Sequence, residues 1–239
     1  MRRDRARAAG VLSEEPSSLV GGATHEEVVR VGDTVHRPPG PDPQLARDVL
    51  LHLERVGFDA APRRLGVDDE GRDVLSWIEG ETFTERGRMH PYVGDPPQRV
   101  TFSDDQLGAV FRLLRRYHDA FGDDVACHGD FGPWNLVWRA GLPVGIIDFD
   151  DVHRGDVSED VAYALRTFVS YGLTDAQPAE LVRRTRLALD AYGRAFDFPA
   201  MLAEEYDRVE ERCLRNGWHR ALAKLPAERA WLEANRRLF

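Results

Sequence analysis

The chain has 239 residues, of which 42% are hydrophobic and 31% are charged, a balance typical of globular proteins that excludes the disordered and fibrous classes. Its 41 acidic and 32 basic residues give a formal net charge of -9, which argues against a general nucleic-acid binder because phosphate neutralisation needs a basic surface. Two cysteines are too few for a disulfide scaffold, and no segment approaches the ~18 uncharged apolar residues of a membrane helix, so we expect a cytoplasmic protein without a membrane or nucleic-acid partner.

A charged tail and a hairpin open the chain. Residues 1–18 mix arginines, acids, serines and prolines without a period, and we expect them to form a mobile tail. Val28–Val31 and Thr34–Arg37 flank Gly32-Asp33, a two-residue loop typical of a β-hairpin. Pairing across this loop predicts that four side chains share one face of the hairpin: Val28, Arg30, Val35 and Arg37.

A helix and a second hairpin follow. Asp42 before Pro43 is typical of a helix N-cap, and apolar residues recur at helical spacing from there to Gly57. Arg64–Val67 and Arg72–Ile78 then predict two paired strands. We therefore expect residues 19–80 to form a small β-rich lobe.

Helical patterns dominate from residue 81 to residue 239. Ser103 and Gln106 form a capping box that opens a helix reaching Phe121. Short apolar runs between Gly- and Pro-bearing loops predict small strands at Val125–Cys127, Asn135–Trp138 and Val144–Ile147. Long amphipathic segments cover Val157–Tyr171, Ala179–Phe196 and most of Pro199–Leu238. The pattern predicts an α+β fold of two lobes, the second one larger and mainly helical.

The candidate chemistry lies in His128-Gly129-Asp130-Phe131-Gly132-Pro133-Trp134-Asn135 and in Ile147-Asp148-Phe149-Asp150. Phosphoryl transfer needs a carboxylate that orients or deprotonates the acceptor hydroxyl, and oxygen ligands that hold Mg²⁺ against the nucleotide phosphates. Asp130 is the candidate base or orienting residue, and Asn135 and Asp148 are the candidate metal ligands. The alternative is that Asp130 and Asn135 only cap turns.

The segments HGDFGPWN, IDFDD and GDVSEDVAY resemble those of the aminoglycoside phosphotransferase-like small-molecule kinases, distant relatives of protein kinases. The resemblance runs from about Leu19 to Phe168 in element order. It implies a bilobal protein-kinase-like fold, a cleft for ATP or GTP with Mg²⁺, and transfer of the γ-phosphoryl group to a hydroxyl of a small molecule. It also implies roles for single residues: Asp130 as catalytic base, Asn135 and Asp148 as metal ligands, Asp160 as a buried brace of the catalytic loop, and Ser76, Trp77, Ile78 and Glu79 as the hinge beside the adenine.

The N-terminal lobe departs from the family pattern. A lysine is expected on the third strand, but Lys224 is the only lysine in the chain. Arg37 is the substitute that we expect at the phosphates, with Val35 contacting the base from the same face. Because a planar guanidinium is not interchangeable with an ammonium, the alternative is an exposed strand arginine without this role.

Two further features of this lobe have two interpretations each. Asp48 and Glu54 are candidates for the acidic partner that the family places on the first helix, or they are surface charges. Gly21 and Gly22 form either a loop that covers the phosphates with backbone N–H groups or an ordinary turn.

Structural roles are assigned to the other polar residues near the motif. Tyr117 and His118 are expected to pack or to satisfy a neighbour, Cys127 lacks the layout of a catalytic nucleophile, and His128 is expected to support the loop backbone. An acid-rich stretch either lines the site of a cationic acceptor or forms a solvated helix face: Glu204, Glu205, Asp207, Glu210 and Glu211.

Three functions are compatible with these residues. The first is a kinase of an aminoglycoside-like or other cationic or hydroxylated compound, and the second is a kinase of a primary metabolite such as an amino alcohol or a sugar. The third is a pseudokinase that binds a nucleotide or metabolite without turnover, which the missing lysine favours. The retained set of Asp130, Asn135 and Asp148 makes an enzyme our expectation, with the acceptor, the choice between ATP and GTP and the oligomeric state open.

Overall fold

An antiparallel sheet forms the first lobe of the computed structural model, which describes residues 17–18, 28–82 and 102–239. Its five strands lie in the order β1-β2-β3-β5-β4, with bounds β1 Ser17–Ser18, β2 Val29–Val31, β3 Thr34–Arg37, β4 Arg64–Val67 and β5 Asp73–Ser76. Arg30 pairs with Val35 across the first hairpin, which confirms the predicted register. Ser17 and Ser18, assigned by the sequence to the tail, instead pair with Arg30 and Val29 at the sheet edge.

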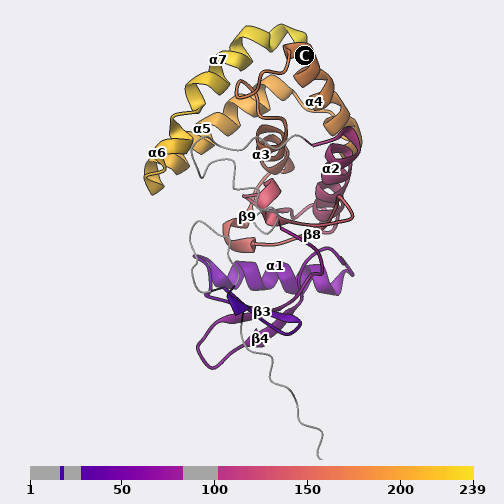
Figure 1. The fold of residues 1–239 in the computed structure, drawn as a ribbon, viewed down its shortest axis with the longest axis vertical. Coiled ribbons are helices and arrows are strands. Elements are labelled where there is room, and N and C mark those ends of the chain that lie inside the picture. Colours follow the sequence, from indigo (N-terminus) through magenta and orange to yellow (C-terminus); the bar gives the residue numbers. More distant parts are fainter. Residues whose placement is uncertain (1–16, 19–27, 83–101) are drawn as a thin grey trace, which may run out of the picture.

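Helix α1 (Pro43–Arg55) lies between the sheet and the second lobe (Figure 1). The Asp42 side chain accepts a hydrogen bond from the Leu45 N–H at 3.1 Å, which confirms the predicted N-cap. The apolar face of α1 is buried at Val49, Leu50 and Leu53. At its other end the His52 ring lies 2.8 Å from the carbonyl oxygen of Ala120, just past the end of helix α2 (Asp104–Asp119).

The segment after β5 is attached to the second lobe through its backbone. Glu81 and Trp138 exchange two backbone hydrogen bonds of 2.8 Å each. Gly80 has a φ of 151°, and a Cβ there would lie 2.6 Å from Val137 Cγ1, so that only glycine fits this approach. The connection between the lobes is therefore fixed to a strand of the C-terminal lobe.

The second lobe is mainly helical and lies opposite the sheet in Figure 1. Two short strand pairs, β6–β9 and β7–β8, face the first lobe, and the helices surround the main core. The bounds are α2 Asp104–Asp119, β6 Ala126–Cys127, β7 Leu136–Arg139, β8 Leu142–Ile146, β9 His153–Arg154, α3 Val157–Val169, α4 Pro178–Tyr192, α5 Phe198–Asn216, α6 His219–Leu222 and α7 Leu225–Asn235. Three 3₁₀ turns complete it: Pro133–Asn135, Phe149–Asp151 and Arg236–Leu238. The α+β class and the helical second lobe are confirmed.

Local backbone geometry explains where the elements differ from prediction. Strand β8 begins at Leu142 because Ala140 and Gly141, with φ of 50° and 83°, form a tight turn that pairs Leu142 with Arg139. The last amphipathic segment is divided because Gly217 ends α5 in the left-handed conformation. Within the described ranges, none of the helices combines the length and apolar composition needed to cross a bilayer.

Candidate active site

Asp130 lies in the loop between β6 and β7, and its carboxylate accepts hydrogen bonds on both oxygens. Tyr163 donates its hydroxyl to Oδ1, while Oδ2 accepts from Trp134 Nε1 at 3.0 Å and from Asn135 Nδ2 at 2.8 Å. Burial raises the pKa of Asp130, against the opposing effect of the hydrogen bonds from Tyr163 and Trp134. The three donors fix the orientation of the carboxylate in a poorly solvated place.

Asp160 braces the same loop from the start of α3, as the resemblance implied. Its carboxylate accepts the backbone N–H groups of His128 at 2.6 Å and of Gly129 at 2.9 Å, and it lies 3.0 Å from His118 Nε2. Burial acts to raise the pKa of Asp160, but the hydrogen bond and charge of His118 bring it below its ordinary value. Asp160 is 1% exposed, so the loop rests on a buried, fully engaged carboxylate.

The neighbouring histidines and cysteine have structural contacts, as expected. His118 also lies 2.8 Å from the Tyr192 hydroxyl, and His128 Nε2 lies 3.1 Å from the carbonyl oxygen of Ile147. The Cys127 thiol is buried and donates to the Asp156 carbonyl oxygen at 3.3 Å. Burial raises the pKa of this thiol far above its ordinary value, which is unfavourable for a nucleophile.

Asn135 and Asp148 are brought together by the strand pair β7–β8. The Ile147 N–H donates to the Asn135 carbonyl oxygen at 2.9 Å, so Asp148 directly follows the residue bonded to Asn135. Asp148 has a φ of 66° and a ψ of 71°, a left-handed conformation that is uncommon for a residue with a side chain. Since the Asn135 N–H₂ group points at Asp130, the amide oxygen of Asn135 and the carboxylate of Asp148 are the atoms suited to a hard cation.

Arg37 reaches this place from β3. Its guanidinium donates through Nη1 to Asp148 Oδ1 at 3.0 Å and through Nη2 to Asp150 Oδ2. The Arg37 side chain is only 13% exposed, so the interpretation as an exposed strand arginine is wrong. Val35, on the same face, lies between Arg30 and Leu75 in the sheet.

The acidic candidates on α1 do not pair with Arg37. Asp48 is exposed and accepts from Gln44 at 2.9 Å, and Glu54 lies 3.9 Å from Arg63. The interpretation of both as surface charges is the correct one, because the partners of Arg37 come from the C-terminal lobe. Gly21 and Gly22 lie outside the described residues.

The four hinge candidates comprise Ser76, the last residue of β5, and the three residues that follow it. Ser76 pairs with Thr34, and the Trp77 N–H donates to the Asp33 carbonyl oxygen at 2.8 Å. The Trp77 indole donates to Glu79 at 2.9 Å. Ile78 packs against Gly145, where an added Cβ would lie 2.9 Å from the Ile78 side chain. The structure thus places this segment beside β8, and its contact with a nucleotide stays a prediction.

The acid-rich stretch on α5 is compensated by arginines. Glu205 is buried and accepts from Arg208 at 3.1 Å, and Glu204 lies 4.0 Å from the same guanidinium. Arg229 pairs with Asp207 at 2.9 Å and with Glu210 at 2.8 Å. At Glu205 the solvated-face interpretation is wrong, and these pairs reduce the negative charge available to a cationic acceptor.

Tyr163, Trp134 and Arg212 belong to the site although the motif analysis gave them no role. Tyr163 lies three residues after Asp160 on α3, a spacing that puts both on one helix face and could have identified it. Trp134 is part of the motif itself. Arg212, on α5, donates to the Gly129 carbonyl oxygen at 3.1 Å, and no local pattern connects it to a loop 83 residues away.

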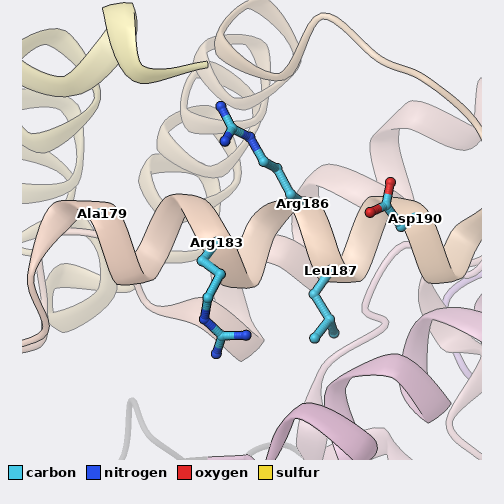
Figure 2. A pocket seen from close by; sticks show the side chains of 5 residues that line it. All are labelled: Ala179, Arg183, Arg186, Leu187 and Asp190. Atoms are coloured by element: carbon cyan, nitrogen blue, oxygen red, sulfur yellow. The ribbon is translucent and has the colours of Figure 1, made fainter.

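A separate hollow lies on the outer surface of α4 (Figure 2). It has a volume of about 430 Å³ and is lined by Ala179, Arg183, Arg186, Leu187 and Asp190. Arg183 is already paired with Asp104 and Glu180, both at 2.7 Å. None of the residues predicted for catalysis lines it, so the chemistry is assigned to the loops around Asp130 instead.

Comparisons with known proteins identify relatives of the chain. Residues 95–203 match the model of the phosphotransferase enzyme family. The chain is 34% identical over 214 residues to the trifolitoxin immunity protein of Rhizobium leguminosarum bv. trifolii, and the match covers 76% of this chain and 75% of that protein.

Two solved structures are similar at low sequence identity. One is the macrolide 2′-phosphotransferase of Brachybacterium faecium, with a TM-score of 0.56, 13% identity and coverage of 88% of this chain and 91% of that chain. The other is a thermostable mutant of aminoglycoside phosphotransferase APH(4)-Ia, with a TM-score of 0.51, 15% identity and coverage of 93% and 95%. These likenesses confirm the expected fold.

Proposed function

The chain belongs to the phosphotransferase enzyme family, and we propose that it transfers the γ-phosphoryl group of ATP or GTP to a hydroxyl group of a small molecule. One observation carries the proposal: a half-buried Asp130 oriented by three donors stands beside Asn135, next to the oxygen-rich turn that begins at Asp148. A turn-capping role alone does not require a carboxylate whose two oxygens both accept hydrogen bonds from side chains.

The residues present fit Mg²⁺. The Asn135 amide oxygen and the Asp148 carboxylate are hard oxygen donors. The backbone of Asp148 is in the left-handed conformation, and such strain persists only where the surrounding structure holds the turn in place. The Asp148 side chain is 42% exposed, which leaves a face for an incoming ion with nucleotide phosphates. When bound, Mg²⁺ would neutralise charge on the phosphates.

Asp130 supplies the proton chemistry in this proposal. The acceptor hydroxyl donates to the Asp130 carboxylate, its oxygen forms a bond to the γ-phosphorus, and the bond from that phosphorus to the leaving nucleoside diphosphate breaks. The hydroxyl proton passes to Asp130. Arg37 donates hydrogen bonds to Asp148 and Asp150, and in this proposal it releases one of these carboxylates and binds a phosphate oxygen of the nucleotide instead.

A toxic compound is the acceptor class that the comparisons favour. The relative that matches three quarters of its length is named for immunity to trifolitoxin, and phosphorylation of a hydroxyl alters a small toxin's charge and shape. We extend this to the chain as a proposal: its acceptor is a hydroxyl-bearing toxin rather than a primary metabolite.

The first test is calorimetric titration of Mg²⁺·ATP and Mg²⁺·GTP into the full chain. We expect saturable binding of at least one nucleotide that Asp148→Ala weakens and that Asp123→Ala, at an exposed loop carboxylate, leaves unchanged. Transfer of γ-phosphate is then measured with hydroxyl-bearing toxins and with amino alcohols and sugars. Binding without transfer or hydrolysis would favour the pseudokinase alternative, and absence of binding would refute the proposed function.

A further inference from the structure

Arg212 joins helix α5 to the catalytic loop at the residue before Asp130. Its Nη1 donates to the Gly129 carbonyl oxygen at 3.1 Å and lies 3.7 Å from Asp151 Oδ2. Gly129 has a φ of 79°, and a Cβ there would lie 2.2 Å from the Asp151 carbonyl oxygen. The backbone that presents Asp130 is thus held tightly between Arg212 and the turn at Asp151.

The same guanidinium also lies over the ring whose hydroxyl holds Asp130. Its central carbon is 5.1 Å from the Tyr163 ring centroid, within the range of a cation–π contact. The Tyr163 hydroxyl donates to Asp130 Oδ1. The Trp218 ring lies 5.9 Å from Arg212, and the Arg212 side chain is 23% exposed. This largely desolvated cation thus contacts the catalytic loop, the turn at Asp151, α3 and the residue before α6.

We propose that Arg212 is a positioning residue for phosphoryl transfer, which acts through the Gly129 carbonyl group and the Tyr163 ring to hold the Asp130 carboxylate toward the acceptor. The inference rests on the proposed function, because it assigns Asp130 the acceptor hydroxyl. Arg212 is not itself assigned a contact with the reacting atoms.

The two contacts control one side of Asp130. Trp134 and Asn135, from the Pro133–Asn135 turn, hold Oδ2, whereas Tyr163 holds Oδ1 and Gly129 sets the backbone before it. Loss of Arg212 therefore leaves the Oδ2 side intact and loosens the Oδ1 side. Small displacements of a reacting group lower the rate of the chemical step. The candidate metal ligands Asn135 and Asp148 do not touch Arg212 in any described contact, so nucleotide binding should change little.

Arginine is suited to this place by its shape. A planar guanidinium can stack on a ring while its edge donates to a carbonyl oxygen, and a lysine ammonium at one point cannot do both in the same way. We therefore expect Arg212→Lys to retain only part of the kcat that Arg212→Met loses. Tyr163→Phe should resemble Arg212→Met, because it keeps the ring and removes the hydrogen bond to Asp130.

The test is a double-mutant cycle on the full chain with Arg212→Met, Tyr163→Phe and the double variant. Arg215→Met, at an exposed position one turn further along α5, is the matched control. Turnover of Mg²⁺·ATP or Mg²⁺·GTP, with water or an identified acceptor, gives kcat and the nucleotide KM, and thermal unfolding reports on the fold. We expect each single variant to lower kcat by about 10- to 100-fold with the nucleotide KM within about twofold.

Because both residues act through Asp130, the double variant should be no more than about twofold slower than the slower single variant. Unchanged kcat in Arg212→Met, or losses that multiply in the double variant, would overturn the inference. If Arg212→Met lowers Tm, kcat and nucleotide affinity together, Arg212 has a purely structural role, and that result would also overturn the inference. If Arg212→Met does not fold, Arg212→Lys and Tyr163→Phe carry the same comparison. A wild-type chain without any turnover would instead refute the proposed function, and the inference with it.

Discussion

The catalytic loop and strand β3 hold their functional side chains in different ways. Asp130 and Asp160 are engaged by partners from the C-terminal lobe alone, through the loop, α2, α3 and the turn at Asn135. Arg37 comes from the sheet of the N-terminal lobe and finds both of its carboxylates, Asp148 and Asp150, in the other lobe. The loop is thus assembled within one lobe, whereas the cation is placed only where two lobes meet.

This difference separates two measurable quantities. A group that is fixed within the C-terminal lobe should affect turnover or stability, because its geometry does not need the sheet. A group that bridges the lobes should affect nucleotide affinity, because a nucleotide binds where the lobes meet in the proposed function. Five predictions test this separation.

The largest effect is expected at Asp130. Asp130→Asn keeps the volume of the side chain but removes the proton acceptor, so phosphoryl transfer should fall by about 10²- to 10⁴-fold. Calorimetry should give a nucleotide affinity close to that of the wild-type chain, because Asp130 is not among the candidate metal ligands. Turnover retained at the wild-type rate would show that Asp130 is only a turn residue.

Asp160, on α3, should affect stability more than Asp130, the carboxylate of the loop that it braces. Asp160→Asn takes away a buried charge that two backbone N–H groups and His118 surround, and a loss of about 3–5 kcal/mol in the free energy of unfolding is expected. Urea denaturation followed by circular dichroism measures it. A loss below about 1 kcal/mol would mean that the loop does not depend on this brace.

A pH-dependent stability is expected from Glu205. Burial raises the pKa of Glu205 to about 7, against the opposing charges of Arg208, Arg166 and Arg212. Because its pKa is higher in the folded state than in the unfolded state, the folded state favours the protonated Glu205. Its contribution to stability is therefore full below the unfolded-state pKa near 4.5 and is lost as the pH rises through about 7.

Glu205→Gln should remove this part of the pH dependence, on the order of 2–3 kcal/mol between pH 4.5 and 8. Denaturation at several pH values measures it. Glu204→Gln, at an exposed position of the same helix, is the control and should keep the wild-type slope. Parallel pH profiles of Glu205→Gln and the wild-type chain would contradict the assignment.

Arg37 should act on affinity instead. Arg37→Met removes the bridging cation, and we expect about a tenfold loss in affinity for Mg²⁺·ATP or Mg²⁺·GTP. This loss is at the lower end of the range for a charged hydrogen bond, because Arg37 gives up its ion pairs with carboxylates when it binds a phosphate. kcat at saturating nucleotide should stay within about threefold. If kcat falls while the affinity stays constant, Arg37 belongs with the catalytic loop and the distinction between the regions fails.

The same distinction explains how much of the site the sequence could predict. The capping box at Ser103, the N-cap at Asp42 and the register at Arg30 depend on residues a few positions apart, and all three are confirmed. Asp130 and Asn135 share one loop, so their juxtaposition also follows from local spacing. Arg37 meets Asp148 across 111 positions, and Arg212 meets Gly129 across 83. Such contacts depend on how separate elements pack, which no local pattern encodes.

The smallest effect is expected at Asp48, where the family pattern and the structure disagree. On the family pattern, an acid on the first helix would pair with the strand cation, and its loss would weaken nucleotide binding as much as Arg37→Met. In the structure Asp48 is exposed and bonds Gln44 one turn away, while α1 directs Arg47 toward Asp73 of β5 at 3.0 Å. Asp48→Asn should therefore change the nucleotide affinity by less than about twofold and the free energy of unfolding by less than about 0.5 kcal/mol. A tenfold loss of affinity would mean that Arg37 exchanges Asp148 for Asp48 when nucleotide binds, and that the ion pairs seen here belong to the nucleotide-free arrangement.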